Sequence, residues 1–251
     1  MMLTGFNVDI SRQAKDLCYS KKSLMDLYFT AGVHPYDAKS WNNQSYQEIK
    51  EMTKDPLCVS VGELGLDYHY DYSTPEEQKH VFEQQVRLAI EVGKPMFLHE
   101  REAHEDFVQI LNKFKGQLPQ SVVHCFTGNE KELQTYLDMG FYIGLTGYLW
   151  KDLSDNGVRS ILRSNMIPLD KLMIETDAPF MCPDLTDLPD DMKKCITATS
   201  KDFVDKYCSE EKNEPCSLPL VLELIASLMN KDAKDVAAAT TNNAVRIFKL
   251  H

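Results

Sequence analysis

Seven short apolar runs, separated by stretches with helical periodicity, constrain the fold of this chain more than any other feature. The runs are rich in Val, Ile, Leu, Phe and Met, which is typical of strands buried on both faces of a sheet. They lie at residues 1–5, 27–34, 57–63, 95–99, 121–126, 141–147 and 171–177. Strands that alternate with helices form parallel sheets, so an α/β fold follows.

The stretches between the runs carry the signals of helix ends. Thr74 and Glu77 match a capping box, and Gly93 is placed to end the helix that begins there. Similar helical patterns occur at 103–116, 129–140 and 218–248. Repeated strand–helix units with buried strands, and no glycine-rich nucleotide motif, favour a TIM (β/α)8-type barrel over an open doubly wound sheet.

The length of 251 residues suits a single barrel, and we expect one domain over 1–251. The segment 181–217 is acidic and interrupted by prolines, and we expect an irregular surface excursion there with one short helix. Only seven strands are visible where a barrel has eight. Because the chain opens directly on a strand, we expect that the first strand of the barrel is missing.

Composition restricts the class of protein. No run approaches the 18 apolar residues of a membrane span, and the N-terminal segment lacks the basic flank and apolar stretch of a signal peptide. We therefore expect no membrane association and an intracellular location, cytoplasmic, nuclear or both. The seven cysteines include no C-x-x-C pair, which favours reduced thiols. A net charge of −11 argues against non-specific coating of nucleic acid, although not against an enzyme that meets phosphate through metal ions.

Histidines and carboxylates occur where the predicted strands end. These residues are His34, Glu63, His99, His124, Glu175 and Asp177. The carboxyl ends of barrel strands share one face, where barrel enzymes place their sites. Imidazole and carboxylate together are ligands for Zn²⁺, Mn²⁺ or Fe²⁺, and carboxylate-rich sets also bind Mg²⁺. Each residue alone could instead be a hydrogen-bonded structural group, but their shared position predicts a divalent-metal site.

Two further side chains suggest contacts with a substrate. Arg101 follows His99 by two residues and could bind a phosphate or carboxylate, or form a salt bridge with a nearby Glu. Tyr148 and Trp150 follow the sixth run and could stack on a base, or pack on their own helix. The remaining internal histidines are interpreted as solvated, and these are His69, His80 and His104.

Seven short motifs resemble those of the TatD family of metal-dependent deoxyribonucleases, in the wider amidohydrolase-like barrel group. They are "AGVHP" (31–35), "VGELGLDY" (61–68), "FLHER" (97–101), "VVHCFTG" (122–128), "YIGLTGY" (142–148), "MIETDAP" (173–179) and "NEPCSLP" (213–219). They follow the family order over nearly the whole chain. The resemblance implies a TIM barrel and a 3′→5′ exonuclease or phosphodiesterase that requires Mg²⁺ or a similar cation.

The resemblance also assigns roles to residues. It implies that the metal ligands are Glu63, His99, His124 and Asp177. It places His34 and Glu175 in the site, close to the substrate or behind the ligands. As a separate mechanistic hypothesis, we expect Asp177 to orient the attacking water and take its proton, with His34 and Glu175 as further catalytic residues. From their positions alone, we expect Arg101 and Tyr148 to contact substrate. The implied cofactor is one or two divalent ions, Mg²⁺ first with Mn²⁺ or Zn²⁺ as alternatives. The implied substrate is single-stranded DNA or its 3′ ends, and a monomer is expected.

One departure leaves alternatives open. Family members begin with a strand ending in H-x-H or an Asn-Leu-Thr type sequence, and this chain has neither. Besides a nuclease, the same ligands would suit a metal-dependent hydrolase of an ester or amide, such as an aminoacyl-tRNA deacylase. A truncated barrel that binds nucleic acid or a protein without turnover is a third interpretation.

Overall fold

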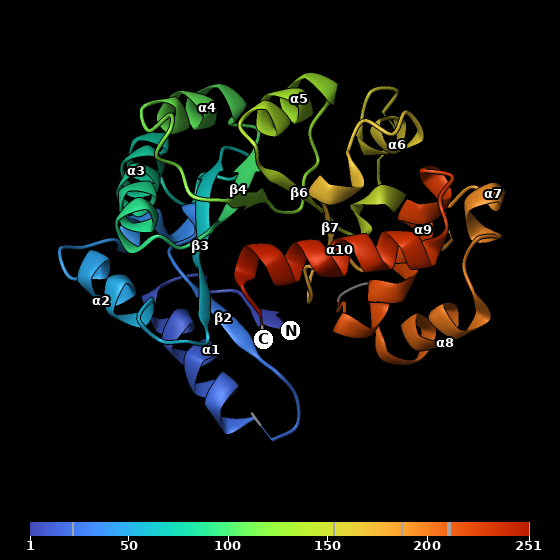
Figure 1. The fold of residues 1–251 in the computed structure, drawn as a ribbon, viewed down its shortest axis with the longest axis horizontal. Coiled ribbons are helices and arrows are strands. Elements are labelled where there is room, and N and C mark those ends of the chain that lie inside the picture. Colours follow the sequence, from blue (N-terminus) through green and yellow to red (C-terminus); the bar gives the residue numbers. More distant parts are fainter. Residues whose placement is uncertain (22, 153, 187, 210–211, 251) are drawn as a thin grey trace. The chain divides into compact units, whose positions relative to one another are not determined.

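The computed structural model of the chain describes residues 1–21, 23–152, 154–186, 188–209 and 212–250 (Figure 1). By its contacts the chain divides into two compact units. The first comprises Met1–His124 with Ile247–His251, and the second comprises Cys125–Arg246. Within the described residues, none of the helices combines the length and apolar character needed to cross a membrane.

The first unit contains five parallel strands that pair in chain order. They are β1 (Met2–Leu3), β2 (Tyr28–Ala31), β3 (Cys58–Asp67), β4 (Met96–Arg101) and β5 (Ser121–Val123). In the register of β3 and β4, Gly65 lies opposite His99 and Asp67 opposite Arg101. All ten residues of β3 are buried, as expected for a strand covered on both faces. The first five predicted strands are therefore confirmed, with β3 extending further than predicted.

Helices follow these strands in the first unit. They are α1 (Val8–Ser20), η1 (Pro35–Ser40), α2 (Ser45–Met52), α3 (Pro75–Val92) and α4 (His104–Asn112). The predicted capping box is present, since the Thr74 side chain accepts the Glu77 N–H and the Glu77 carboxylate accepts the Thr74 N–H. Gly93 ends α3 with a left-handed φ of +64°. The predicted boundaries of this helix are thus confirmed at both ends.

A buried core holds α1, α2 and α3 against β2 and β3 (Figure 1). Its fully or nearly fully buried side chains include Ala14, Cys18, Phe29, Ile49, Cys58, Val81 and Leu88. Burying aliphatic and aromatic side chains of this size contributes about 1.5–3 kcal/mol each. This packing fixes the strands whose ends carry the polar residues.

The second unit pairs two parallel strands, β6 (Tyr142–Leu145) and β7 (Leu172–Ile174), as predicted. Its helices are α5 (Glu130–Asp138), η2 (Gly147–Trp150), α6 (Val158–Arg163), η3 (Leu169–Lys171), α7 (Asp190–Lys193), α8 (Ala198–Tyr207), η4 (Pro215–Ser217), α9 (Leu218–Leu228) and most of α10 (Ala233–Phe248). Asn129 begins α5 with a second capping box. All seven predicted strands are therefore present in the structure.

The segment 181–217 contains more helix than the sequence predicts, because α7, α8 and η4 all lie within it. Leu188, Met192 and Val204 are buried there, so apolar side chains anchor the segment. The Thr197 side chain accepts the Ser200 N–H and caps α8. Residues 187, 210 and 211 of this segment lie outside the described residues.

Candidate active site

A buried carboxylate on β3, Glu63, lies among three imidazoles. Its Oε1 atom is 2.7 Å from His99 Nδ1, 2.6 Å from His124 Nε2 and 3.4 Å from His34 Nε2. His34 follows β2, His99 lies on β4, and His124 comes directly after β5. The structure therefore brings together four of the predicted site residues from neighbouring strands, although Glu63 and His99 lie before the last residues of β3 and β4.

Local backbone contacts set the orientation of these rings. His34 is the N-cap of η1, and its Nδ1 accepts the Tyr36 N–H at 3.1 Å, which leaves Nε2 directed toward Glu63. The His124 N–H donates to the Leu98 carbonyl at 2.9 Å and continues the pairing of β5 with β4. The His34 ring is thus oriented by η1, and the backbone of His124 is fixed by its pairing with β4.

Glycine allows β3 to approach β4 closely at the site. Gly65 has a φ of +153°, and a Cβ atom built on it would lie 1.8 Å from the His99 carbonyl oxygen. No side chain fits in that space, and L residues rarely adopt this backbone conformation. Gly65 therefore permits the strand contact that brings His99 against the carboxylates of β3.

Asp67 is a member of this cluster that the sequence analysis missed. Its Oδ2 lies 2.8 Å from His99 Nε2, its Oδ1 accepts the His69 N–H at 2.9 Å, and the residue is fully buried. A carboxylate in this position orients an imidazole whose other nitrogen serves as a ligand. The available signal was its spacing, since residues 63 and 67 share one side of a strand with a period of two.

Burial and mutual contact shift the pKa values of these groups. Burial opposes ionisation of Glu63, but the adjacent His124 and His34 imidazoles outweigh it and hold its pKa well below the usual range. Burial lowers the pKa of His34 more than Glu63 raises it. For His99, burial is outweighed by hydrogen bonds to Asp67 and Glu63, so its pKa is raised. The carboxylate charge is therefore stabilised by its imidazole neighbours.

The donor set fits a divalent metal ion. One ligand atom from each of His34, Glu63 and His99 lies within 4.8 Å of the others, and these atoms are imidazole nitrogens and a carboxylate oxygen. Such atoms are common ligands of divalent transition metals. His124 contacts the same Glu63 oxygen and also lies 3.3 Å from His99 Nδ1. The structure thus contains a group able to bind a metal ion, as the sequence predicts, and this group includes His34, for which a catalytic role rather than a ligand role was expected.

The predicted site residues of the second unit form their own contacts. Glu175 follows β7, and its Oε1 accepts the Cys125 N–H at 2.5 Å. The segment containing Asp177 is held by Asn213, whose Nδ2 donates to the carbonyls of Thr176 at 2.9 Å and Phe180 at 2.8 Å. The "NEP" segment therefore shapes the loop after β7. The participation of Asp177 and Glu175 in the metal site stays a prediction.

The predicted substrate contacts also lie at the ends of strands. Arg101 is the last residue of β4, and its Cζ lies 5.6 Å from the centre of the Tyr70 ring. Tyr148 lies in η2 after β6, where its N–H donates to the Thr146 side chain at 3.1 Å. Their roles in binding substrate stay predictions.

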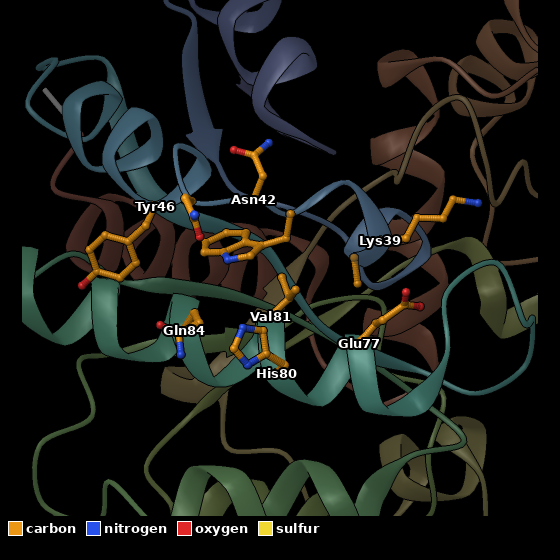
Figure 2. Close-up of a pocket in the computed structure, with 10 residues that line it drawn as sticks. Lys39, Asn42, Tyr46, Glu77, His80, Val81 and Gln84 are labelled. Carbon is orange, nitrogen blue, oxygen red and sulfur yellow. The ribbon is translucent and has the colours of Figure 1, made fainter.

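A separate hollow lies in the first unit between α3 and the segment from η1 to α2 (Figure 2). Figure 2 shows Glu77, His80, Val81 and Gln84 on the α3 side. None of the described residues that line this hollow is a predicted site residue. His80 is exposed there, as predicted, and His69 is also exposed, as predicted, although it pairs with Glu102, with Nδ1 2.7 Å from Oε1.

Known structures support the assignment of the fold. A hydrolase TatD family protein from Entamoeba histolytica superimposes with a TM-score of 0.85 at 24% identity, covering 98% of this chain and 83% of that one. A TatD homologue from Escherichia coli K12 gives 0.79 at 21% identity, covering 100% and 86%. With its parallel strands and intervening helices, the chain is an α/β protein of the TIM-barrel type, carrying a candidate metal site.

Sequence relatives identify the family. The sequence model of the TatD-related DNases matches residues 1–249. A protein named 3′-5′ ssDNA/RNA exonuclease TatD from Edwardsiella piscicida is 38% identical over 250 residues, covering 100% of this chain and 88% of that protein. The protein of the same name from Pectobacterium parmentieri is 38% identical over 257 residues with the same coverage. The chain belongs to the TatD-related DNase family, which confirms the predicted family and the prediction of an enzyme that acts on DNA.

Proposed function

We propose that this chain is a divalent-metal-dependent 3′→5′ exonuclease that hydrolyses phosphodiester bonds at the 3′ ends of single-stranded DNA. The observation that carries the proposal is the Glu63 carboxylate of β3 enclosed by three imidazoles, which come from β4 and from the residues that follow β2 and β5. Relatives with 38% identity are named for 3′-5′ exonuclease action on ssDNA and RNA, which supports both the polarity and the single-stranded substrate.

In this proposal the metal ligands are Glu63, His99, His124 and Asp177. His99 would offer Nδ1, because Asp67 accepts a hydrogen bond from its Nε2. Mg²⁺ is the proposed ion, with Mn²⁺ or Zn²⁺ as substitutes in a site of one or two ions. When bound, such an ion supplies Lewis-acid activation of the phosphodiester and of water.

The residues around the ligands complete the chemistry. Asp177 would orient the attacking water and accept its proton, and His34, next to Glu63, would stabilise negative charge that develops on the phosphate. Glu175 assists by holding the backbone at Cys125, the residue after His124. Arg101 would bind a phosphate and Tyr148 a base. We further propose a monomer located in the cytoplasm or nucleus.

The test is cleavage of 3′- and 5′-end-labelled single-stranded DNA with Mg²⁺ or Mn²⁺, comparing the wild type with His124→Ala. Lys113→Ala, which changes an exposed residue at the end of α4, is the matched control. We expect stepwise shortening from the 3′ end that is lost with EDTA and with His124→Ala but not with Lys113→Ala. A folded, metal-binding protein that leaves DNA intact would contradict the proposal, and hydrolysis of an aminoacyl ester instead would reassign the site to another substrate class.

A further inference from the structure

Three tyrosines gather beside the imidazoles of the candidate site. Tyr36 lies in η1, and its ring centre is 5.7 Å from that of Tyr70 and 5.0 Å from that of Tyr72. Tyr70 and Tyr72 are themselves 5.4 Å apart. They are 46% and 54% exposed, so about half of the surface of each residue is free for contact with a ligand.

The tyrosine cluster, Tyr36–Tyr70–Tyr72, is continuous with the candidate metal group. The Tyr36 ring lies edge-on to His34, with centres 4.5 Å apart, and 6.3 Å from the ring of His99. A ligand resting on the exposed tyrosines would therefore reach the imidazoles across a single intervening ring.

The backbone that carries the exposed tyrosines is anchored to its surroundings. Ser73 is buried, and its hydroxyl donates to the Tyr36 carbonyl at 3.0 Å and accepts the Lys39 N–H at 3.1 Å. Buried Gln78 donates from Nε2 to the carbonyls of Asp67 and Ser73. The segment between β3 and α3 is thus fixed at both ends. Preorganised rings lose less conformational entropy when they bind a ligand.

The charges near the cluster indicate the kind of ligand. Arg101 lies 5.6 Å from the Tyr70 ring and supplies one cation, whereas the chain as a whole carries a net charge of −11. An acidic protein gains little from contacts along a phosphate backbone, which need many cations. Base stacking on aromatic rings does not depend on net charge and is tolerant of sequence. The cluster therefore suits unpaired nucleobases, whose faces are free, better than a duplex.

We propose that Tyr70 and Tyr72, backed by Tyr36, form a stacking platform for the unpaired nucleobases near the 3′ end of a single strand, with Arg101 on an adjacent phosphate. This inference rests on the proposed function, because it assumes that the strand end enters the candidate site next to His34. The platform selects single strands, since bases within a duplex are already stacked and paired. It binds the strand mainly through aromatic rings.

The test measures binding of an oligothymidylate that carries the fluorescent base 2-aminopurine at its 3′ end. Its last linkages are phosphorothioates and divalent ions are left out, so that the probe is bound but not cleaved. Binding is monitored by the fluorescence of 2-aminopurine. We expect the fluorescence of 2-aminopurine to fall when the wild type binds the probe. Tyr70→Ala and Tyr72→Ala should each raise the Kd for the probe about tenfold. Tyr70→Phe and Tyr72→Phe keep the ring and are the matched controls, with Kd near that of the wild type. Used as an unlabelled competitor, an oligonucleotide with an abasic 3′ end should bind the wild type about as weakly as the Ala variants bind the probe.

Two results would overturn the platform, namely Ala variants that bind as tightly as the wild type, or Phe variants that bind as weakly as the Ala variants. Thermal melting of each variant separates loss of binding from loss of folding. Cleavage of unmodified DNA, measured in parallel, separates the two proposals. If the wild type and the Ala variants degrade DNA with the same KM, the platform fails but the exonuclease proposal stands. If tyrosine-dependent quenching persists but no DNA is cleaved, the exonuclease alone fails.

Discussion

Replacing Asp67 with Asn should weaken divalent-metal binding, because this carboxylate selects the ring nitrogen of His99 that carries the proton. In the structure Asp67 Oδ2 lies 2.8 Å from His99 Nε2, and His99 Nδ1 faces Glu63 at 2.7 Å. A carboxylate only accepts hydrogen bonds, so a neutral His99 keeps its proton on Nε2 and leaves the Nδ1 lone pair available to a metal.

The amide of Asp67→Asn changes this preference with almost no change in shape. In the wild type the His69 N–H donates to Asp67 Oδ1 at 2.9 Å, and the amide oxygen of the variant can still accept this hydrogen bond. The amide nitrogen then faces His99 Nε2 as a donor and favours the tautomer protonated on Nδ1, so that Nδ1 has no lone pair to offer a metal. Loss of such an orienting carboxylate lowers metal affinity about 10- to 100-fold. That range corresponds to about 1.4–2.7 kcal/mol of binding free energy.

Calorimetric titration with Mn²⁺ would measure the effect, and thermal melting would confirm that the variant is folded. Asp106→Asn is the matched control, because Asp106 is likewise an aspartate that accepts a hydrogen bond, from the Tyr68 hydroxyl at 2.7 Å, but it belongs to α4. We expect the control to bind Mn²⁺ like the wild type. A folded Asp67→Asn protein with a Kd within twofold of the wild type would refute the reasoning about the tautomer.

Three further predictions concern stability and metal binding. Gly65→Ala should lower the free energy of unfolding by about 3 kcal/mol or more, because the new Cβ would lie 1.8 Å from the His99 carbonyl oxygen. Gly93→Ala is the control: its Cβ would have nothing within 4 Å, so it should lose only about 1 kcal/mol because of its left-handed φ. Equal losses of stability in urea denaturation would contradict this prediction. At pH 7 Asp55→Asn should be about 1 kcal/mol less stable than the wild type. Burial opposes ionisation of Asp55, but hydrogen bonds from Leu57, Lys15 and Tyr19 outweigh it and lower the pKa of Asp55. The ionised Asp55 therefore stabilises the fold fully above its unfolded pKa near 4, and this stabilisation disappears as pH falls through the lower folded pKa. Denaturation at pH 7 and pH 3 should show this difference narrowing in acid, and a constant difference would argue against the ionised Asp55. Mn²⁺ at about 100 times its Kd should stabilise the wild type by about 2.7 kcal/mol, and EDTA should reverse the shift; the same stabilisation of Glu63→Gln would show that the ion binds elsewhere.

The proximity of His34, Glu63 and His99 could be predicted because each of them closes an apolar run of the sequence. The order of strands places His34, Glu63 and His99 at neighbouring strand ends, and the structure brings their ligand atoms within 4.8 Å. The boundaries of α3 were readable for a similar reason, since a capping box and a left-handed glycine are local signals. Features set by one element and its immediate neighbours were therefore accessible from sequence.

Features that depend on packing between distant segments were not accessible. Asp67 contacts His99 only because β3 continues for four residues after Glu63 and pairs with β4, with Gly65 opposite His99. The contacts of Tyr70 and Tyr72 with Tyr36 depend on how a loop is tied through Ser73, which no periodicity indicates. The helices of 181–217 form around buried Leu188, Met192 and Val204, whereas the acidic composition of the segment suggested an irregular one.

The close approach of β3 to β4 at Gly65 makes "ELGLD" (63–67) a single structural unit. The glutamate and the aspartate are four residues apart and so share a side of the strand, and the residue midway between them has no room for a side chain. This yields a rule for interpreting other chains: Glu-x-Gly-x-Asp at the end of a buried parallel strand, followed by a His at the corresponding position of the next strand, indicates a metal ligand and its orienting carboxylate. Where a bulkier residue replaces the glycine, the strands must separate and the same acidic pair no longer reaches one imidazole.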